Sequence, residues 1–232
     1  MKTAQNLKEY KQRLKKALDN KFLRTAMGTF ASAYKEAQGR LFAGVDVPAL
    51  TREIAAGKDA ALPHLEELYE TFKAHAEAAG VKVHLAGTAL EANEIIAGIA
   101  RDNGVKKILK SKSMTAEETF LNDHLEKDGF EVVETDLGEW IIQLRHEGPS
   151  HMVMPAIHLS RQEVAELFTK VTGEPQEPDI GQLVKVARRV LRKHFLSADM
   201  GVSGANFAIA ATGTLGIISN EGNARLTTTL PR

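Results

Sequence analysis

Cysteine is absent from this sequence of 232 residues, and its absence excludes several kinds of chemistry. The chain can form no disulfide, because each bridge joins two thiols. It cannot bind zinc through thiolates, and it cannot by itself hold an ordinary iron–sulfur cluster, which needs about four cysteine ligands. We therefore expect no cofactor and no metal site of these kinds within the chain.

An excess of one charge and long apolar runs are also missing. Lys and Arg total 30 and Asp and Glu total 30, so no overall field attracts nucleic acid or anionic lipid. No apolar run approaches the roughly 20 residues that cross a bilayer, and the amino terminus lacks the apolar core of a signal peptide. We expect a cytoplasmic protein with neither nucleic-acid nor membrane partners.

The sequence has enough apolar residues, 43% of the total, to form a large buried core. In the amino-terminal part these residues follow helical spacing. Leu7, Tyr10, Leu14 and Leu18 recur at steps of three and four, and the helical pattern continues to a glycine stop signal at Gly80. We predict that residues 1–80 form a helical region packed on a core of residues 81–232, in what is a single domain overall.

After residue 80 the period changes to an alternation of strands and helices. Residues 81–85, 107–109 and 130–133 are predicted as strands, with helices starting after Thr88 and over residues 115–127. Strand and helix alternating at this spacing predict parallel βαβ units with right-handed crossovers. The fold class is therefore α/β, with a Rossmann-like parallel sheet and an N-terminal helical extension.

The remainder of the chain continues the α/β series. Helices are predicted over residues 139–144, 161–171 and 180–195, and a buried strand over residues 152–154. The apolar runs 207–210 and 215–219 are separated by glycines, which indicates closely spaced strands and turns.

A first candidate ligand site follows the strand at residues 107–109. Lys110, Ser111, Lys112 and Ser113 lie where a strand ends and a helix begins, which is where open α/β sheets bind anions. These side chains could hold a phosphate or a carboxylate. The alternative is that Thr115 and Glu118 form a capping box and that both lysines are merely solvated. No P-loop or GxGxxG motif is present, so nucleotide binding has little support.

A second candidate site contains carboxylates. Asp136 and Glu139 follow a predicted strand and could serve as general acid and base, together with Glu118 from the preceding helix. The spacing of Asp136 and Glu139 is equally that of a helix cap. The nearby His146, His151 and His158 match no metal-binding spacing, and His151 is kept as a candidate ligand-binding residue because it directly precedes the strand predicted at residues 152–154.

The carboxyl-terminal segment combines small polar side chains with glycines. Glycine allows a ligand to approach backbone amides closely, and hydroxyl groups can donate hydrogen bonds to an anion. A set of tight turns explains the same composition equally well. The candidate ligand-binding residues of this segment are Thr212, Gly213, Thr214, Asn220, Glu221 and Asn223.

These same segments resemble the LUD domain family and, within it, the lactate utilization protein B branch. The stretch KSKSMTAEETFLNDHLEKDGFEVVETDLGEWIIQL and PSHMVMPAIH carry the resemblance over residues 110–158. GVSGANFAIAATGT and SNEGNARLTTTLP carry it over residues 201–231. One departure is Ala211, where the family tends to have an acidic residue before the TGT motif.

The resemblance implies a fold like that of the sugar-phosphate isomerase and CoA-transferase superfamily. It implies that the chain is the LUD-domain portion of one component of a complex that oxidises L-lactate to pyruvate. The partners it implies are other lactate-utilization subunits and a small anionic ligand, and a homo-oligomer is compatible with it. In that branch a ferredoxin-like region with two [4Fe–4S] clusters ordinarily follows, so clusters are expected only if the full-length protein has such a region.

Two other functions remain open from the sequence. One is an autonomous enzyme of the sugar-phosphate isomerase or CoA-transferase type, in which Glu118, Asp136 or Glu139 acts as acid or base while Lys112 holds an anion. The other is a structural interaction domain without a small ligand.

Overall fold

The computed structural model describes residues 6–219 and 221–231, and these residues form two compact units. The larger unit takes the described residues of Met1–Leu23, His84–Ala205 and Ile217–Arg232. The smaller takes Arg24–Val83 and Asn206–Gly216. The boundary predicted at residue 80 lies close to Val83, but a hairpin that the sequence assigned to the core belongs to the smaller, mainly helical unit.

Within the described residues, the larger unit contains one three-stranded parallel sheet in the order β2-β1-β3. The strands are β1 (Lys107–Lys110), β2 (Glu131–Glu134) and β3 (Met200–Val202). Ile108 is the pairing partner of Val132 on one side and of Met200 on the other. Helices connect the strands, so the predicted Rossmann-like α/β fold class is confirmed.

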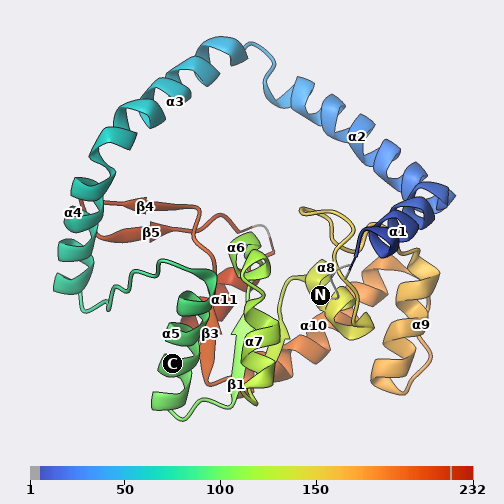
Figure 1. The fold of residues 1–232 in the computed structure, drawn as a ribbon. Coiled ribbons are helices and arrows are strands. Elements are labelled where there is room, and N and C mark those ends of the chain that lie inside the picture. The colour runs from blue at the N-terminus through green and yellow to red at the C-terminus, as the bar shows by residue number, and fades with distance from the viewer. Residues whose placement is uncertain (1–5, 220, 232) are drawn as a thin grey trace. The chain divides into compact units, whose positions relative to one another are not determined.

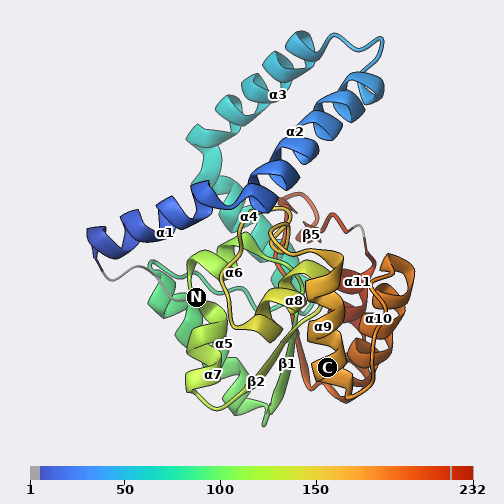
Figure 2. The ribbon, with the colours of Figure 1, turned by 90° about the vertical axis from the view of Figure 1, so that its right-hand side faces the viewer.

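Helices cover both faces of this sheet, as Figure 2 shows. Successive side chains of a strand point to opposite faces, and the two cores follow that alternation. Ile108 and Val132 pack against α5 (Ala89–Asp102), α6 (Met114–Glu118) and α7 (Leu121–Lys127). Leu109 and Val133 pack against α8 (Leu137–Arg145), α9 (Arg161–Thr172) and α10 (Ile180–Ser197). Lys110 and Glu134, two positions beyond Ile108 and Val132, therefore share the face of α6 and α7.

A further helix that the sequence did not predict, α11 (Asn223–Thr229), packs against β3. The approach is close because Gly201 lacks a side chain: a Cβ atom there would lie 1.8 Å from the carbonyl oxygen of Thr227. Glycine at this position thus permits α11 to lie on the sheet.

Most of the predicted helices and strands after residue 80 are present, and three of these predictions are wrong. The helix expected over residues 115–127 is two helices, because the backbone of Phe120 is left-handed, with φ of 55°. Residues 81–85 form no strand, since the Val81 amide donates to the Ala76 carbonyl at the end of a helix. Residues 152–154 form no strand either: Met152 and Val153 are exposed, and the amides of Val153 and Met154 donate to His151 Nδ1.

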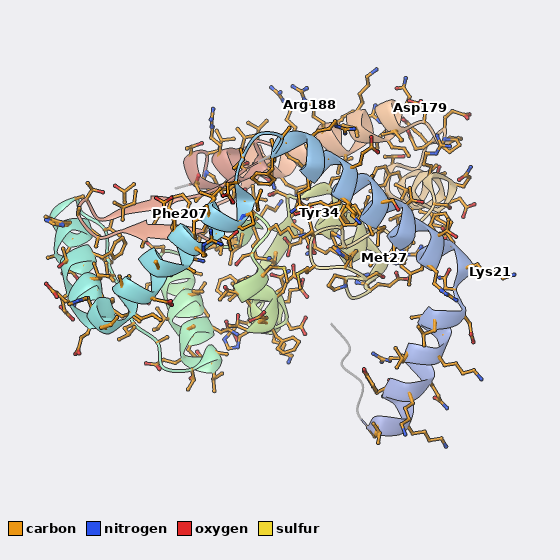
Figure 3. All side chains as sticks on the ribbon, turned by 90° about the horizontal axis from the view of Figure 1, so that it is seen from above. Lys21, Met27, Tyr34, Asp179, Arg188 and Phe207 are labelled. Carbon is orange, nitrogen blue, oxygen red and sulfur yellow. The ribbon has the colours of Figure 1, made fainter. Side chains whose placement is uncertain are left out.

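The smaller unit confirms the helical reading of the amino-terminal region. After α1 (Leu7–Asp19), which lies in the larger unit, come α2 (Lys21–Leu41), α3 (Val47–Ala61), the short 3-10 helix η1 (Leu62–His64) and α4 (Leu65–Ala78). Figure 3 labels Met27 and Tyr34 along α2, a helix with no buried residue. No helix in the described part of the chain is both long and apolar enough to cross a membrane.

A hairpin of β4 (Phe207–Ile209) and β5 (Thr214–Gly216) completes the smaller unit and confirms the closely spaced strands predicted for this segment. It lies beside α4 (Figure 1), where the His75 ring is hydrogen-bonded to the Ala210 carbonyl at 2.9 Å. Gly213, with φ of 66°, lies against the backbone of Ala76.

The core beneath α9 gives a test of this fold. Phe168 is 0% exposed, and its ring lies 5.2 Å from that of Trp140, the chain's one tryptophan. Phe168→Ala should lower the free energy of unfolding of the larger unit by about 3–5 kcal/mol, because it leaves a cavity in a packed core. Urea unfolding followed by tryptophan fluorescence measures it. Val184→Ala, at an exposed position of α10, should change stability by less than about 0.5 kcal/mol.

Candidate functional site

A buried ion pair lies at the carboxyl ends of β1 and β2. Lys110 Nζ is 2.9 Å from Glu134 Oε1, and the two side chains are only 1% and 5% exposed. Asn122 also donates to Glu134 Oε1, at 2.6 Å. Burial raises the pKa of the Glu134 carboxyl group above its ordinary value. The positive charge of Lys110 and the hydrogen bond from Asn122 partly oppose this rise. Lys110, predicted to bind an anion, is thus paired inside the protein.

A second ion pair lies beside the first. Lys112 Nζ is 3.2 Å from Glu139 Oε1 and also donates to the Val153 carbonyl at 3.1 Å. The Lys112 side chain is 23% exposed and that of Glu139 is 7% exposed. The Asp136 carboxylate accepts the amides of Gly138 and Glu139, so the cap interpretation is correct for Asp136. Glu139 instead directs its side chain to Lys112.

Glu117, which sequence reasoning missed, joins this group from α6. Burial raises the pKa of Glu117 to about 7, and the negative charge of Glu139 and a hydrogen bond with it add to the shift, while Lys110 opposes it. The two carboxyl groups can therefore share one proton near neutral pH. Such a pair can donate or accept a proton in that range.

The predicted candidate Glu118, one residue further on, is exposed. The capping box predicted from Thr115 and Glu118 is also wrong, because Ser113 caps α6 by accepting the Ala116 amide at 3.2 Å. The helix starts earlier than expected, and successive residues lie about 100° apart around a helix, so Glu117 faces the strand ends. Ser113 was the sequence signal that could have identified Glu117: with Ser113 as the N-cap, Glu117 and not Glu118 lies on the side of α6 that faces the strand ends.

A cavity of about 350 Å³ opens at this point, bordered by β2, α6, α7 and α8. Glu117, Glu134 and Glu139 contribute their side chains to its wall. Two further wall residues, Phe120 and His146, have left-handed backbones with φ of 55° and 54°. Non-glycine residues adopt this conformation at an energetic cost, and such residues concentrate at functional sites.

Several other predicted residues lie near the strand ends. The Ser111 and Ser203 hydroxyls are 2.7 Å apart, and the Glu221 carboxylate accepts the Leu137 amide at 3.4 Å. Asn223 donates to Thr135 Oγ1 at 3.3 Å, and Thr135 also lies 3.2 Å from the Thr227 hydroxyl. Thr135 and Thr227 are buried, and sequence reasoning missed both.

The rest of the predicted site residues lie elsewhere. Thr212, Gly213 and Thr214 belong to the hairpin of the smaller unit, where Thr212 donates to the Thr214 hydroxyl at 2.9 Å. His151 binds the backbone amides described above, and Asn220 lies outside the described residues. The ligand-binding and catalytic roles assigned from the sequence stay predictions.

Metal binding finds no support in the described residues, where no group of three or more His, Asp or Glu side chains is arranged to hold an ion. His158 bridges Ser150, at 2.7 Å, and Glu147, at 3.0 Å.

Comparison with known proteins gives a consistent set of relatives. The LUD domain family matches residues 69–232. Proteins named lactate utilization protein B from Oceanobacillus iheyensis and Bacillus licheniformis are each 40% identical, over 96% and 97% of this chain and 47% of their own length. The protein of that name from Bacillus subtilis is 39% identical over 96% of this chain and 47% of its own length. The chain spans about half the length of these curated relatives, and no solved structure matched it.

The buried ion pair makes a testable claim about stability. Lys110→Met should lower the free energy of unfolding by about 3–5 kcal/mol, because it leaves the Glu134 carboxylate buried without its cation. The double variant Lys110→Met/Glu134→Gln should regain most of that loss, since no buried charge remains. Urea unfolding at pH 7 compares the three proteins; a single variant as stable as the parent would contradict the pairing.

The raised pKa of Glu117 predicts how stability depends on pH. Between the ordinary pKa of 4.5 and about 7, the folded chain keeps a proton on Glu117 that the unfolded chain releases. The stabilisation that this proton contributes is fully present below pH 4.5, and it is lost as the pH rises through 7. Glu117→Gln removes this loss, which we expect to be roughly 1 kcal/mol because the side chain is partly solvated. Urea unfolding from pH 4 to 8 measures the difference, with Glu118→Gln as the matched control that should follow the parent.

Proposed function

Because the chain belongs to the LUD domain family, we propose that it is the LUD-domain part of a lactate utilization protein, a component of a system that oxidises L-lactate to pyruvate. The observation that carries the proposal is 40% identity across 96% of this chain with a relative named lactate utilization protein B. An identity that extends over nearly the whole chain supports a shared role more strongly than one short motif would.

Within that system this chain has a binding role and does not carry the electrons. Oxidation of lactate to pyruvate removes two electrons and two protons, and electron transfer requires a redox cofactor. The sequence contains no cysteine for thiolate ligation. The [4Fe–4S] clusters of such a system are therefore held by cysteines outside these residues, and other lactate-utilization subunits in the cytoplasm are the partners.

A small anion would bind at the carboxyl ends of β1 and β2, beside Lys112. Of the two lysines there, Lys112 keeps 23% of its side chain exposed whereas Lys110 keeps 1%. The hydroxyls of Ser111 and Ser203, 2.7 Å apart, lie at the carboxyl ends of β1 and β3. The carboxyl ends of parallel strands are where ligands bind in open α/β sheets, and lactate and pyruvate are both small carboxylates.

A hybrid protein tests the role in lactate utilization. In Bacillus subtilis, the portion of lactate utilization protein B that aligns with this chain would be replaced by the chain. We expect the hybrid to restore growth on L-lactate to a strain lacking the native protein. A hybrid with Lys112→Ala should grow at least several-fold more slowly, because the charge-assisted contact to the anion is lost. An expressed hybrid that grows on glucose but not on L-lactate would contradict the proposal.

A further inference from the structure

The cavity bordered by β2, α6, α7 and α8 has a wall rich in carboxyl groups. Three of them are paired with cations that lie outside the wall: Glu134 with Lys110, Glu139 with Lys112 and Glu147 with Arg145. Lys and Arg are absent from its described wall residues, whereas Asp and Glu are frequent. Like charges close together in a partly desolvated space repel a further anion and attract a cation. The carboxyl side chains of the wall are those of Glu117, Asp123, Glu126, Glu134, Glu139 and Glu147.

One carboxylate oxygen in this wall is buried without a hydrogen-bond partner. Glu134 Oε1 accepts a hydrogen bond from Asn122 and is ion-paired with Lys110, while Glu134 Oε2 has no donor in the described part of the chain. The Glu134 side chain is 5% exposed. Leaving a buried acceptor unsatisfied is costly, and buried polar groups in native proteins nearly always have a partner. Glu134 is a wall residue, so a ligand donor that reached this oxygen from the cavity would satisfy it.

The carboxyl groups of Glu117 and Glu139 would also be stabilised by a donor on a ligand. Burial and the negative charge of Glu139 raise the pKa of Glu117 to about 7, so Glu117 keeps its proton up to near neutral pH. A ligand that brings both positive charge and N–H donors would let both groups ionise, since it would replace the proton. Lys112 contacts Glu139 at 3.2 Å and is not itself part of the cavity wall.

The cavity wall also contains apolar side chains. Ala116, Phe120, Ile142 and Pro149 form this part of the wall. A short carbon chain would fit against these side chains, so the ligand has one charged end and one apolar end. An inorganic divalent ion does not match such a wall, and no three carboxylates of the described residues are arranged to coordinate one.

We propose that this cavity binds a small organic cation, with a primary ammonium group that donates to Glu134, Glu117 and Glu139 and a short apolar body that packs against Phe120 and Ile142. This site is distinct in charge from the anion site beside Lys112. The proposal goes beyond the role in lactate utilization and does not depend on it.

Such binding is linked to the proton on Glu117. The charged groups that face Glu117 are Glu139 from α8, Glu134 from β2 and Lys110 from β1. A bound ammonium group favours the ionised form, so binding releases a proton when the pH is below the pKa of Glu117, about 7. The affinity should therefore rise with pH.

Binding of n-propylammonium to the chain tests the proposal, with propionate and 1-propanol as anionic and neutral probes of similar size. Backbone amide shifts in ¹⁵N NMR spectra should move at Glu117, Phe120 and Ile142, with a dissociation constant in the millimolar range, as expected for roughly four heavy atoms. Propionate and 1-propanol should leave these signals in place at the same concentrations. No shift with n-propylammonium at 50 mM, or equal shifts with propionate, would overturn the proposal.

The pH dependence and a matched pair of variants locate the effect. Between pH 6 and 8 the affinity for n-propylammonium should rise about tenfold, because Glu117 ionises over this range. Glu117→Gln should weaken binding at pH 8 at least tenfold and flatten this dependence, whereas Glu118→Gln should behave like the parent. Circular dichroism confirms that both variants are folded. An unchanged affinity and pH profile in Glu117→Gln would place the cation elsewhere and refute the site.

Growth of the hybrid protein on lactate is a separate readout, so the two proposals can fail independently.

Discussion

The ion pair of Lys110 and Glu134 is the constraint on which the centre of this protein depends. The two residues are direct neighbours in the parallel pairing of β1 and β2, and both lie on the face covered by α6 and α7. A shift of one residue in either strand would turn one of the charges to the opposite, apolar face. Removing a charge from water is costly unless its partner is in place, so this pair favours a single register.

The surrounding polar groups follow from that buried pair. Asn122 from α7 completes the coordination of Glu134 Oε1, and Gln143 from α8 accepts the Glu134 amide at 3.0 Å while donating to the Val132 carbonyl. These contacts fix the helices on either side of the strand ends. Beside these contacts Glu117 from α6 meets Glu139 from α8, and burial and the charge of Glu139 raise the pKa of Glu117 to about 7.

The family relationship and the geometry describe different levels of function. Identity with lactate utilization proteins supports a role for the chain in lactate utilization. The iron–sulfur clusters that we propose for the larger system need thiolate ligands, which this sequence without cysteine does not supply. The cavity describes what this part of the protein can bind, and its charge is opposite to that of lactate. Lys112 takes part in both proposed sites. It contacts the Glu139 carboxylate of the cavity wall, and it is the more exposed of the two lysines beside the strand ends, where we propose that the anion binds.

The sequence by itself determined the α/β class, most of the helices, two of the three strands of the sheet, the hairpin and the family, because each depends on local periodicity, capping residues or long motifs. The cap at Asp136 was predictable for the same reason. Only the tertiary structure decided which polar side chains meet. From the sequence, Lys110 could be a solvated cation, but β2 places Glu134 beside it. Residues 152–154 have the sequence pattern of a strand, but in the structure they form none. Glu117 and Glu118 differ by one position, and the orientation of α6 against the sheet alone selects the one that faces the cavity.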